Sequence, residues 1–287
     1  MTFKKITFIL LLVTTNIFAW NQVGHKVVAQ IAYDNLTPQT KTQVDQLTQI
    51  ISKQYPGQID FIDSSIWPDD MSSRGIKTFA QWHYINIPIN ADGKKRKYYS
   101  KTNVVWAINQ AQDVLTNPNS NAFEKALFLR FLIHFVGDIH QPLHTSNYYS
   151  KRFRHGDKGG NLYAIQYGKV DNLHSLWDQC FTLTHQQYPS DKAIITLAHQ
   201  LETEYPKSDF VKQLQQTNPQ VWAYQGHKIA TDYVYKIPYN ARINKEYQQK
   251  GQVICQKQLA LAGYRLADLL NQVLGNEHEK YHHSRGG

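Results

Sequence analysis

The sequence predicts an all-α (mainly α) protein, a single-domain helical bundle with short β-hairpin pieces. Three observations lead to this prediction. Apolar residues recur at helical spacing along most of the chain, capping residues precede several of these stretches, and extended patterns are few and short. The 287 residues are 41% hydrophobic and 18% charged, which suits a chain that can bury a sizeable core. Composition therefore argues against a disordered protein.

Apolar stripes and capping residues place the expected helices. Val, Ile, Leu and Ala recur every three to four positions in three stretches, residues 27–36, 104–115 and 193–201. In "LTPQTK", Thr37 is the expected N-cap and the next residue is proline, which favours the first turn. Asn218 precedes another proline and opens a further helix. A long last helix is expected from about Lys245 to Leu274, with Gly275 ending it.

Strand signals are limited to two short segments. "WHYINIP" and "LYAIQYGKV" are rich in β-branched and aromatic residues and predict short extended or hairpin pieces between helices. The chain contains no internal repeat, low-complexity tract or linker-like segment. We therefore expect one helical domain over residues 20–275, followed by a polar tail at residues 276–287.

The first nineteen residues have the composition of a secretory signal peptide. A basic start, "MTFKK", precedes the apolar run "ITFILLLVTTNIF" and the small residue Ala19. The alternative, a membrane anchor, is less favoured because the run is shorter than the ~20 residues of a spanning helix. We expect cleavage between Ala19 and Trp20, a secreted or periplasmic location, and no stable membrane insertion.

The chain is basic, which points weakly to anionic partners. Without Lys4 and Lys5 of the leader, the formal charge falls from +9 to +7. Positive surfaces attract nucleic acids and anionic lipids, but many basic proteins have no anionic partner. The two cysteines, Cys180 and Cys255, are too far apart for a CxxC zinc site. They can form one disulfide in an oxidising compartment or stay as buried thiols.

Two segments concentrate groups that bind metals. In "HFVGDIHQPLH", His134 and Asp138 are four apart on an expected helix and share one face. Proline follows Gln141 and disfavours helix there, so His144 lies just beyond the helix end. In "DNLHSLWD", His174 and Asp178 repeat the spacing. One such pair is often a plain ion pair, but two pairs on adjacent helices favour a buried zinc site.

Further candidate ligands lie upstream. Asp69 in "WPDDM" and His83 in "QWHYINIP" are expected on loops near the mouth of the bundle. Cleavage after Ala19 would give Trp20 a free α-amino group, which together with its own carbonyl oxygen can chelate a metal. His25 is near enough in sequence to add a third ligand. Signal removal would then complete a metal site.

These motifs together resemble the secreted single-strand-specific zinc nucleases of the S1/P1 type, which share a mainly helical fold with zinc phospholipase C. The resemblance runs from Trp20 to about Asn271 and includes "WNQVGH", "WPDD", "WHYINIP", "HFVGDIHQPLH", "GGN", "NLHSLWD" and "LAGYRLADLLN". It implies three zinc ions, held respectively by Asp69, His83, His134 and Asp138; by His144, His174 and Asp178; and by Trp20, His25 and the shared Asp138. His140 falls outside this set and is expected to support or pack against it.

The resemblance also implies the reaction. Single-stranded RNA and DNA would be cut to 5′-phosphorylated products by an endonuclease that also has 3′-nucleotidase activity. Asp69 would orient or deprotonate the attacking water. Tyr84 would stack on a base, while Asn161 and Asn86 would contact the nucleotide; Asn86 departs from the aspartate common at that position, which leaves the base preference open. Substrates would be single-stranded nucleic acid and nucleotides, and we expect a monomer.

One position departs further from the family pattern. A basic residue is expected three positions after Asp69, where this chain has Ser72, and Arg74 follows two residues later. Because the segment to His83 is one residue shorter than in the fungal relatives, Arg74 is the candidate for the phosphate contact. Two other functions stay open from sequence: a zinc phospholipase C, and a secreted zinc-binding protein without turnover.

Overall fold

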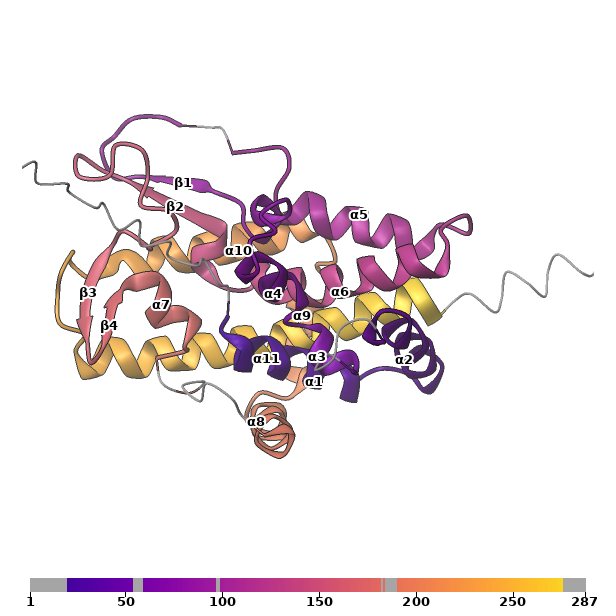
Figure 1. Ribbon diagram of the computed structural model, residues 1–287. Helices are drawn as coiled ribbons and strands as arrows, with labels where there is room; N and C mark the ends of the chain where they lie inside the picture. The colour runs from indigo at the N-terminus through magenta and orange to yellow at the C-terminus, as the bar shows by residue number, and fades with distance from the viewer. Residues whose placement is uncertain (1–19, 54–58, 97–98, 182, 184–189, 276–287) are drawn as a thin grey trace, which may run out of the picture.

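The computed structural model describes residues 20–53, 59–96, 99–181, 183 and 190–275 (Figure 1). Helices dominate these residues, and the strands are few and short, so the predicted mainly α fold is confirmed. The predicted signal peptide and polar tail lie outside the described residues. Of the helices in the described part of the chain, none combines the length and the apolarity needed to cross a membrane.

Long helices form the body of the molecule. α5 packs against α6, α1 against α11 and α8, and α2 against α6. The last half of α6 is buried from Leu129 to Ile139, so this helix runs through the core. The long helices are α1 (Gln22–Asp34), α2 (Pro38–Ser52), α5 (Val104–Thr116), α6 (Ala122–Ile139), α8 (Asp191–Glu204), α10 (Pro219–Asp232) and α11 (Lys245–Gly275).

The predicted helix boundaries are confirmed by their caps. The Thr37 side chain accepts a hydrogen bond from the backbone N–H of Thr40, and the Asn218 side chain accepts one from Gln220. Each bond satisfies a first-turn donor that the helix itself cannot pair. α6 ends at Ile139, three residues before Pro142, as the proline rule predicts.

Short helical turns connect the long helices and carry much of the candidate site. A 3₁₀ turn, η2, directly follows the end of α6, and α7 directly follows a β-hairpin. These elements are α3 (Phe61–Ser64), α4 (Trp67–Ser73), η1 (Ala80–His83), η2 (Pro142–Thr145), α7 (Leu173–Asp178), η3 (Lys207–Phe210), α9 (Val211–Leu214) and η4 (Val234–Lys236).

Two small two-stranded sheets lie beside the helices (Figure 1). β3 (Ala164–Tyr167) and β4 (Val170–Asn172) form an antiparallel hairpin, as "LYAIQYGKV" predicts. β1 (Ile87–Asn90) overlaps only the end of the other predicted segment, "WHYINIP", and is not part of a hairpin. It pairs in parallel with β2 (Ser146–Tyr149), a strand far along the chain. Parallel pairing requires a long crossover, which α5 and α6 provide here.

Candidate metal centre

Four side chains from three elements converge at the C-terminal half of α6. His134 and Asp138 lie one turn apart on α6, Asp69 lies in the first turn of α4, and His83 ends η1. Nδ1 of His83 is 3.0 Å from Oδ2 of Asp138 and 3.1 Å from Nε2 of His134. Oδ1 of Asp69 is 3.6 Å from each of those two histidine nitrogens. The expectation that Asp69 and His83 lie on loops is wrong: both lie in short helical turns.

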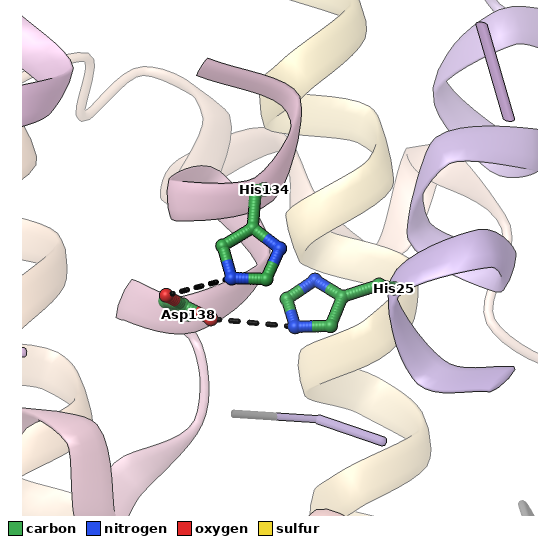
Figure 2. A group of neighbouring side chains, drawn as sticks. All are labelled: His25, His134 and Asp138. Carbon is green, nitrogen blue, oxygen red and sulfur yellow. Dashed lines mark ion pairs between the residues drawn. The ribbon is translucent and has the colours of Figure 1, made fainter. Parts of the chain in front are cut away.

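His25 adds a fifth side chain to this group from α1. Figure 2 shows the His25 ring beside that of His134, with Asp138 joined to both. The two rings stack with centroids 3.9 Å apart, and Nε2 of His25 is 3.4 Å from Oδ1 of Asp138. Asp138 therefore directs one oxygen toward His25 and the other toward His83 and His134. We call these five residues, His25, Asp69, His83, His134 and Asp138, the first cluster.

Trp20 lies beside the first cluster, against α6. Its buried indole donates a hydrogen bond to the carbonyl of Gly137 at 2.9 Å. A Cβ atom added to Gly137 would lie 2.9 Å from the His25 ring and 3.8 Å from that of Trp20. Glycine at this position therefore allows α1 and the Trp20 ring to approach α6 closely. The chain is folded so that the start of the expected mature protein adjoins His25.

A second cluster lies where η2 meets α7. Nε2 of His144 is 3.2 Å from Nε2 of His174, which is 3.4 Å from Oδ2 of Asp178. Asn172 caps α7 by accepting a hydrogen bond from the backbone of Ser175, which fixes the helix that carries both His174 and Asp178. We call His144, His174 and Asp178 the second cluster. Both clusters are almost completely buried.

Backbone carbonyls orient three of the histidine rings. Nδ1 of His134 donates to the carbonyl of Ser65 at 2.6 Å, and Nδ1 of His144 donates to that of His83 at 2.7 Å. Nδ1 of His174 donates to the carbonyl of Gly159 at 2.5 Å. These bonds leave each Nε2 with its lone pair toward the cluster, which is the arrangement found around metal-binding histidines.

Burial has shifted the ionisation of both clusters toward neutral forms. Desolvation lowers the pKa of His25 to about 3 and those of His134 and His144 well below the ordinary value. Desolvation also raises the pKa of Asp69 to about 8 and that of Asp138 well above its ordinary value. Neutral imidazoles are ready to act as ligands, while the carboxyl groups need a buried positive charge to become carboxylates.

The donor atoms fit zinc. Both ring nitrogens of His25, Oδ1 of Asp69 and both Asp138 oxygens are buried without a hydrogen-bond partner. Unsatisfied buried polar atoms are costly, so such a group calls for a cation. Zinc bound at 2.0–2.1 Å in tetrahedral geometry separates its ligand atoms by roughly 3.3 Å. The donor atoms described above are 3.0–3.6 Å apart.

His140, between the two clusters in sequence, is engaged elsewhere. Its Nδ1 donates to the carbonyl of Val136 at 2.7 Å, and its Nε2 accepts from the Arg265 guanidinium at 2.9 Å. The His140 carbonyl accepts from Gln258 of α11. These contacts fasten the end of α6 to α11 and leave no ring nitrogen for a metal.

The two cysteines are buried next to the second cluster. Both are free thiols in the structure, and Sγ of Cys255 donates to the carbonyl of Trp177 at 3.9 Å. Burial raises the pKa of Cys255, and a hydrogen bond with Cys180 raises it further. The thiols are therefore neighbours, and the disulfide stays a prediction.

The expected substrate residues differ in how they are placed. Tyr84 and Asn86 directly follow His83 in the chain, and both are half-buried. Asn161 is half-buried as well, and its Nδ2 donates to the carbonyl of Lys158 at 2.8 Å. Arg74 is exposed at the C-terminal end of α4. Within the described part of the chain, no hydrogen bond joins any of these four side chains to a residue of either cluster.

Lys77, a further cation near the first cluster, was not among the site residues predicted from the sequence. The Lys77 ammonium donates to the carbonyl and hydroxyl oxygens of Ser72 at 2.7 and 3.1 Å. Desolvation dominates the pKa shifts of Asp69, which is raised, and of His83, which is lowered; the charge of Lys77 makes the smallest contribution to each and lowers both. Lys77 thus brings its ammonium to Ser72, the position where the family pattern has a basic residue. The intervening Gly75, at φ +93°, makes the turn that returns the chain.

Comparison with known proteins identifies nucleases that are similar to this chain over most of its length. The chain is 28% identical to Endonuclease 2 of Arabidopsis thaliana, covering 94% of this chain and 96% of that protein. It is 26% identical to Nuclease P1 of Penicillium citrinum over 90% of this chain and 99% of the other. Nuclease S1 of Aspergillus oryzae is 24% identical over 89% and 92%. The family model described as S1/P1 Nuclease matches residues 20–275, and the chain therefore belongs to the S1/P1 nuclease family.

Proposed function

We propose that this protein is a secreted or periplasmic, zinc-dependent endonuclease that hydrolyses phosphodiester bonds of single-stranded RNA and DNA. Its products would carry 5′-phosphates, and 3′-nucleotides would be dephosphorylated at the same centre. Family membership supports the nuclease class. The observation that carries the metal dependence is the convergence of eight buried histidines and aspartates in two adjoining clusters, several of whose donor atoms have no hydrogen-bond partner.

Three zinc ions are proposed, with the ligands divided as the family pattern implies. Asp69, His83 and His134 would hold one ion together with Asp138, and the second cluster would hold another. The third would bind His25, the other oxygen of Asp138 and the α-amino group of Trp20 after signal cleavage. The orientation of Asp138, with separate oxygens toward His25 and toward His83, supports this sharing.

Bound zinc would supply Lewis-acid stabilisation of the phosphate and would lower the pKa of water at the centre. The protein supplies position and proton transfer. Asp69 would orient the attacking water and receive its proton, as the family pattern implies, while its Oδ1 faces the histidine nitrogens of the first cluster. The backbone bonds of His144 and His174 fix their rings at the side of the centre where the departing 3′-oxygen would lie. Excluding bulk water strengthens these electrostatic interactions.

Substrate selection follows from the residues that adjoin the centre. A base must leave its stack to reach a half-buried Tyr84 ring, which favours single strands over duplexes. Asn86 offers both a donor and an acceptor to the base edge. For the phosphate, Lys77 is the stronger candidate than Arg74, because its ammonium lies at Ser72, the position where the family pattern has a basic residue.

The decisive experiment uses mature protein beginning at Trp20, assayed on single-stranded RNA, single-stranded DNA, a 3′-mononucleotide and phosphatidylcholine. Chelation should abolish hydrolysis of the first three, zinc should restore it, and the new termini should be 5′-phosphates. Zinc analysis should give three ions per chain. Hydrolysis of phosphatidylcholine alone would replace the proposal with a phospholipase C, and zinc binding without any turnover would make the protein a metal-binding one.

The proposed cellular location has its own test. Expression of the full chain, followed by N-terminal sequencing of the protein recovered outside the cytoplasm, should yield a chain that starts at Trp20. A protein that keeps Met1 and its leader would contradict both the proposed location and the α-amino ligand.

A further inference from the structure

The positive charge of the chain is concentrated in two short segments. Residues 91–101 contain five lysines and arginines against the single acid Asp92, and residues 150–158 contain four against Asp157. Their formal charges, +4 and +3, equal the +7 of the whole stretch 20–287, so the rest of that stretch is formally neutral. A surface as uneven as this is the usual footprint of an anionic partner. We call residues 91–96 and 150–158, which the structure describes, the basic loops.

The two basic loops start at the same end of the two-stranded sheet formed by β1 and β2 (Figure 1). Because β1 and β2 are parallel, their C-terminal ends lie together, with Asn90 paired to Tyr149. The backbone N–H of Ala91 donates to the carbonyl of Tyr149 at 2.9 Å. The Arg96 guanidinium lies 4.3 Å over the Tyr149 ring and donates to Asn90 at 3.1 Å. The first loop therefore folds back onto the start of the second.

The same sheet starts at the metal centre. At its N-terminal end, the backbone N–H of Ile85 donates to the carbonyl of His144 at 2.8 Å. The second loop then returns to the centre at Gly159, whose carbonyl accepts from His174. Four residues of β-strand span roughly 13 Å, so the basic loops begin about that far from the clusters. Lys158, at the end of the second loop, precedes Gly159 and so adjoins the second cluster, whereas a substrate must extend past the reacting nucleotide to reach the loop residues near the ends of the strands.

The two acids of the basic loops are hydrogen-bonded within the protein, whereas most of the cations face solvent. Asp92 accepts two hydrogen bonds from Arg96, each at 2.8 Å. Asp157 is buried and accepts from the Tyr235 hydroxyl at 2.7 Å and from the backbone of Tyr148. The side chains exposed to solvent are those of Lys94, Lys95, Lys151, Arg152, Arg154 and Lys158.

Aromatic rings lie among these cations and hold the second loop in shape. The Arg152 guanidinium lies 4.2 Å over the ring of Tyr239, which also contacts Phe153. Gly156, at φ +87°, packs against Asn147, which accepts from the backbone N–H of Lys158. Cations interleaved with aromatic faces on an ordered surface match a flexible polyanion that carries bases.

We propose that the basic loops form a track for the sugar-phosphate backbone of single-stranded nucleic acid, binding nucleotides that lie beyond the one at the metal centre. This inference rests on the proposed function and deepens it by adding a binding site outside the catalytic clusters. The track gives long strands an affinity that a mononucleotide does not have. Part of the specificity for polymeric substrates then comes from the positive charge of the basic loops rather than from the two clusters.

The test compares a long and a short substrate in a charge-reduced variant. The variant changes four exposed basic-loop residues to glutamine: Lys94, Lys95, Lys151 and Arg154. Its zinc-loaded form should show a KM for oligo(dT) of twelve nucleotides raised about tenfold. The salt dependence should also weaken, by about 0.7 in the log–log slope for each phosphate that the variant no longer neutralises. Hydrolysis of a 3′-mononucleotide should be unchanged. A matched control changes four exposed lysines elsewhere to glutamine: Lys53, Lys192, Lys212 and Lys245.

The remaining outcomes separate the track from the proposed function. An equal change on both substrates, no change on either, or the same loss in the matched control would overturn the track. Binding of a phosphorothioate 12-mer, followed by fluorescence anisotropy, decides the track even if the wild-type protein hydrolyses nothing, in which case the proposed function alone fails. If the variant loses binding to phosphatidylglycerol vesicles while the 12-mer is bound and cut normally, the basic loops serve a membrane surface and the track is wrong.

Discussion

The first and second clusters use the same residue types at similar burial, yet the protein supports them differently. In the second cluster, Asp178 has one oxygen bonded to the Gln141 side chain at 2.6 Å, and its other oxygen faces His174. In the first cluster, both oxygens of Asp138 lack a hydrogen-bond partner and both nitrogens of His25 do as well. The carboxylate of the second cluster is therefore held by a protein hydrogen bond, whereas a bound cation would be needed to satisfy the unpaired atoms of the first.

The largest expected effect comes from the carboxylate that the first cluster shares. Asp138→Asn should remove two zinc ions and lower kcat/KM by roughly three orders of magnitude, since it weakens two charge-stabilising sites at once. Asp178→Asn, the matched change in the second cluster, should remove one ion. Metal analysis of the two purified variants, alongside their kinetics, gives the comparison. Loss of the same number of ions in both would show that Asp138 is not shared.

A smaller effect should follow from removing the support of the second cluster. Gln141→Met keeps the side-chain volume but loses the bond to Asp178, and changes of this kind typically cost about 10–100-fold in metal affinity. Zinc competition with a chelator should show one weakened ion and two unchanged ones. Gln258→Met is the control, because Gln258 bonds the nearby His140 carbonyl and, in the described part of the chain, no hydrogen bond joins its side chain to a cluster residue. Weakening of all three ions in Gln141→Met would mean a general loss of structure.

Substitution of Lys77 should change phosphate binding at the first cluster alone. Lys77→Met should raise KM for a 3′-mononucleotide about tenfold, the cost of one charged hydrogen bond to phosphate. Arg74→Met, an equal loss of charge on the same segment, should change KM little. Restoration by Lys77→Arg would support a direct phosphate contact. A larger effect of Arg74→Met than of Lys77→Met would reverse the assignment.

The smallest expected effect is a change of stability with pH in zinc-free protein. With the pKa of Asp69 raised from 3.8 to about 8, the folded chain keeps a proton that the unfolded chain has lost between those values. Stability therefore falls as pH rises through this window, by up to about 1.4 kcal/mol per pH unit for each such group. The pKa of His25, lowered to about 3, has the opposite sign and acts only below pH 6.5.

Urea unfolding at pH 6.5 and 8, in the unsubstituted protein and in Asp69→Asn, isolates the carboxyl contribution, because the histidines, which are half protonated in the unfolded chain at pH 6.5, contribute equally to both proteins. Zinc-free protein should be less stable at pH 8, and zinc-loaded protein should not, since a bound cation stabilises the carboxylate. Asp69→Asn should reduce the slope of the zinc-free protein. An unchanged slope in that variant would assign the effect to the other buried carboxyl groups.

Local patterns predicted most of the long helices, but not the contacts that depend on distant segments. Helical spacing placed His134 and Asp138 on one face of α6, and the proline rule placed His144 beyond its end. The short α4 was missed, although a proline and two aspartates in its first turn are typical of a helix start, because seven residues give no periodic signal.

Long-range geometry accounts for the other differences. β1 pairs with a strand that follows the whole α5–α6 hairpin, and no local pattern specifies such a partner. Lys77 reaches Ser72 only because the chain turns at Gly75, so spacing from Asp69 pointed to Arg74 instead. In both cases the residues could be read from the sequence, but their contacts depend on the tertiary structure.

The two oxygens of Asp138 face different partners, and this has a consequence for how the centre fills. If the proposed zinc ions bind, one carboxylate shared by two of them would make their binding equilibria interdependent, and each ion would change the affinity for the other by the same factor. Neither affinity is then a property of its own ligands alone. Zinc uptake by the first cluster would follow a coupled binding curve, and any substitution on one side of Asp138 would be felt on the other.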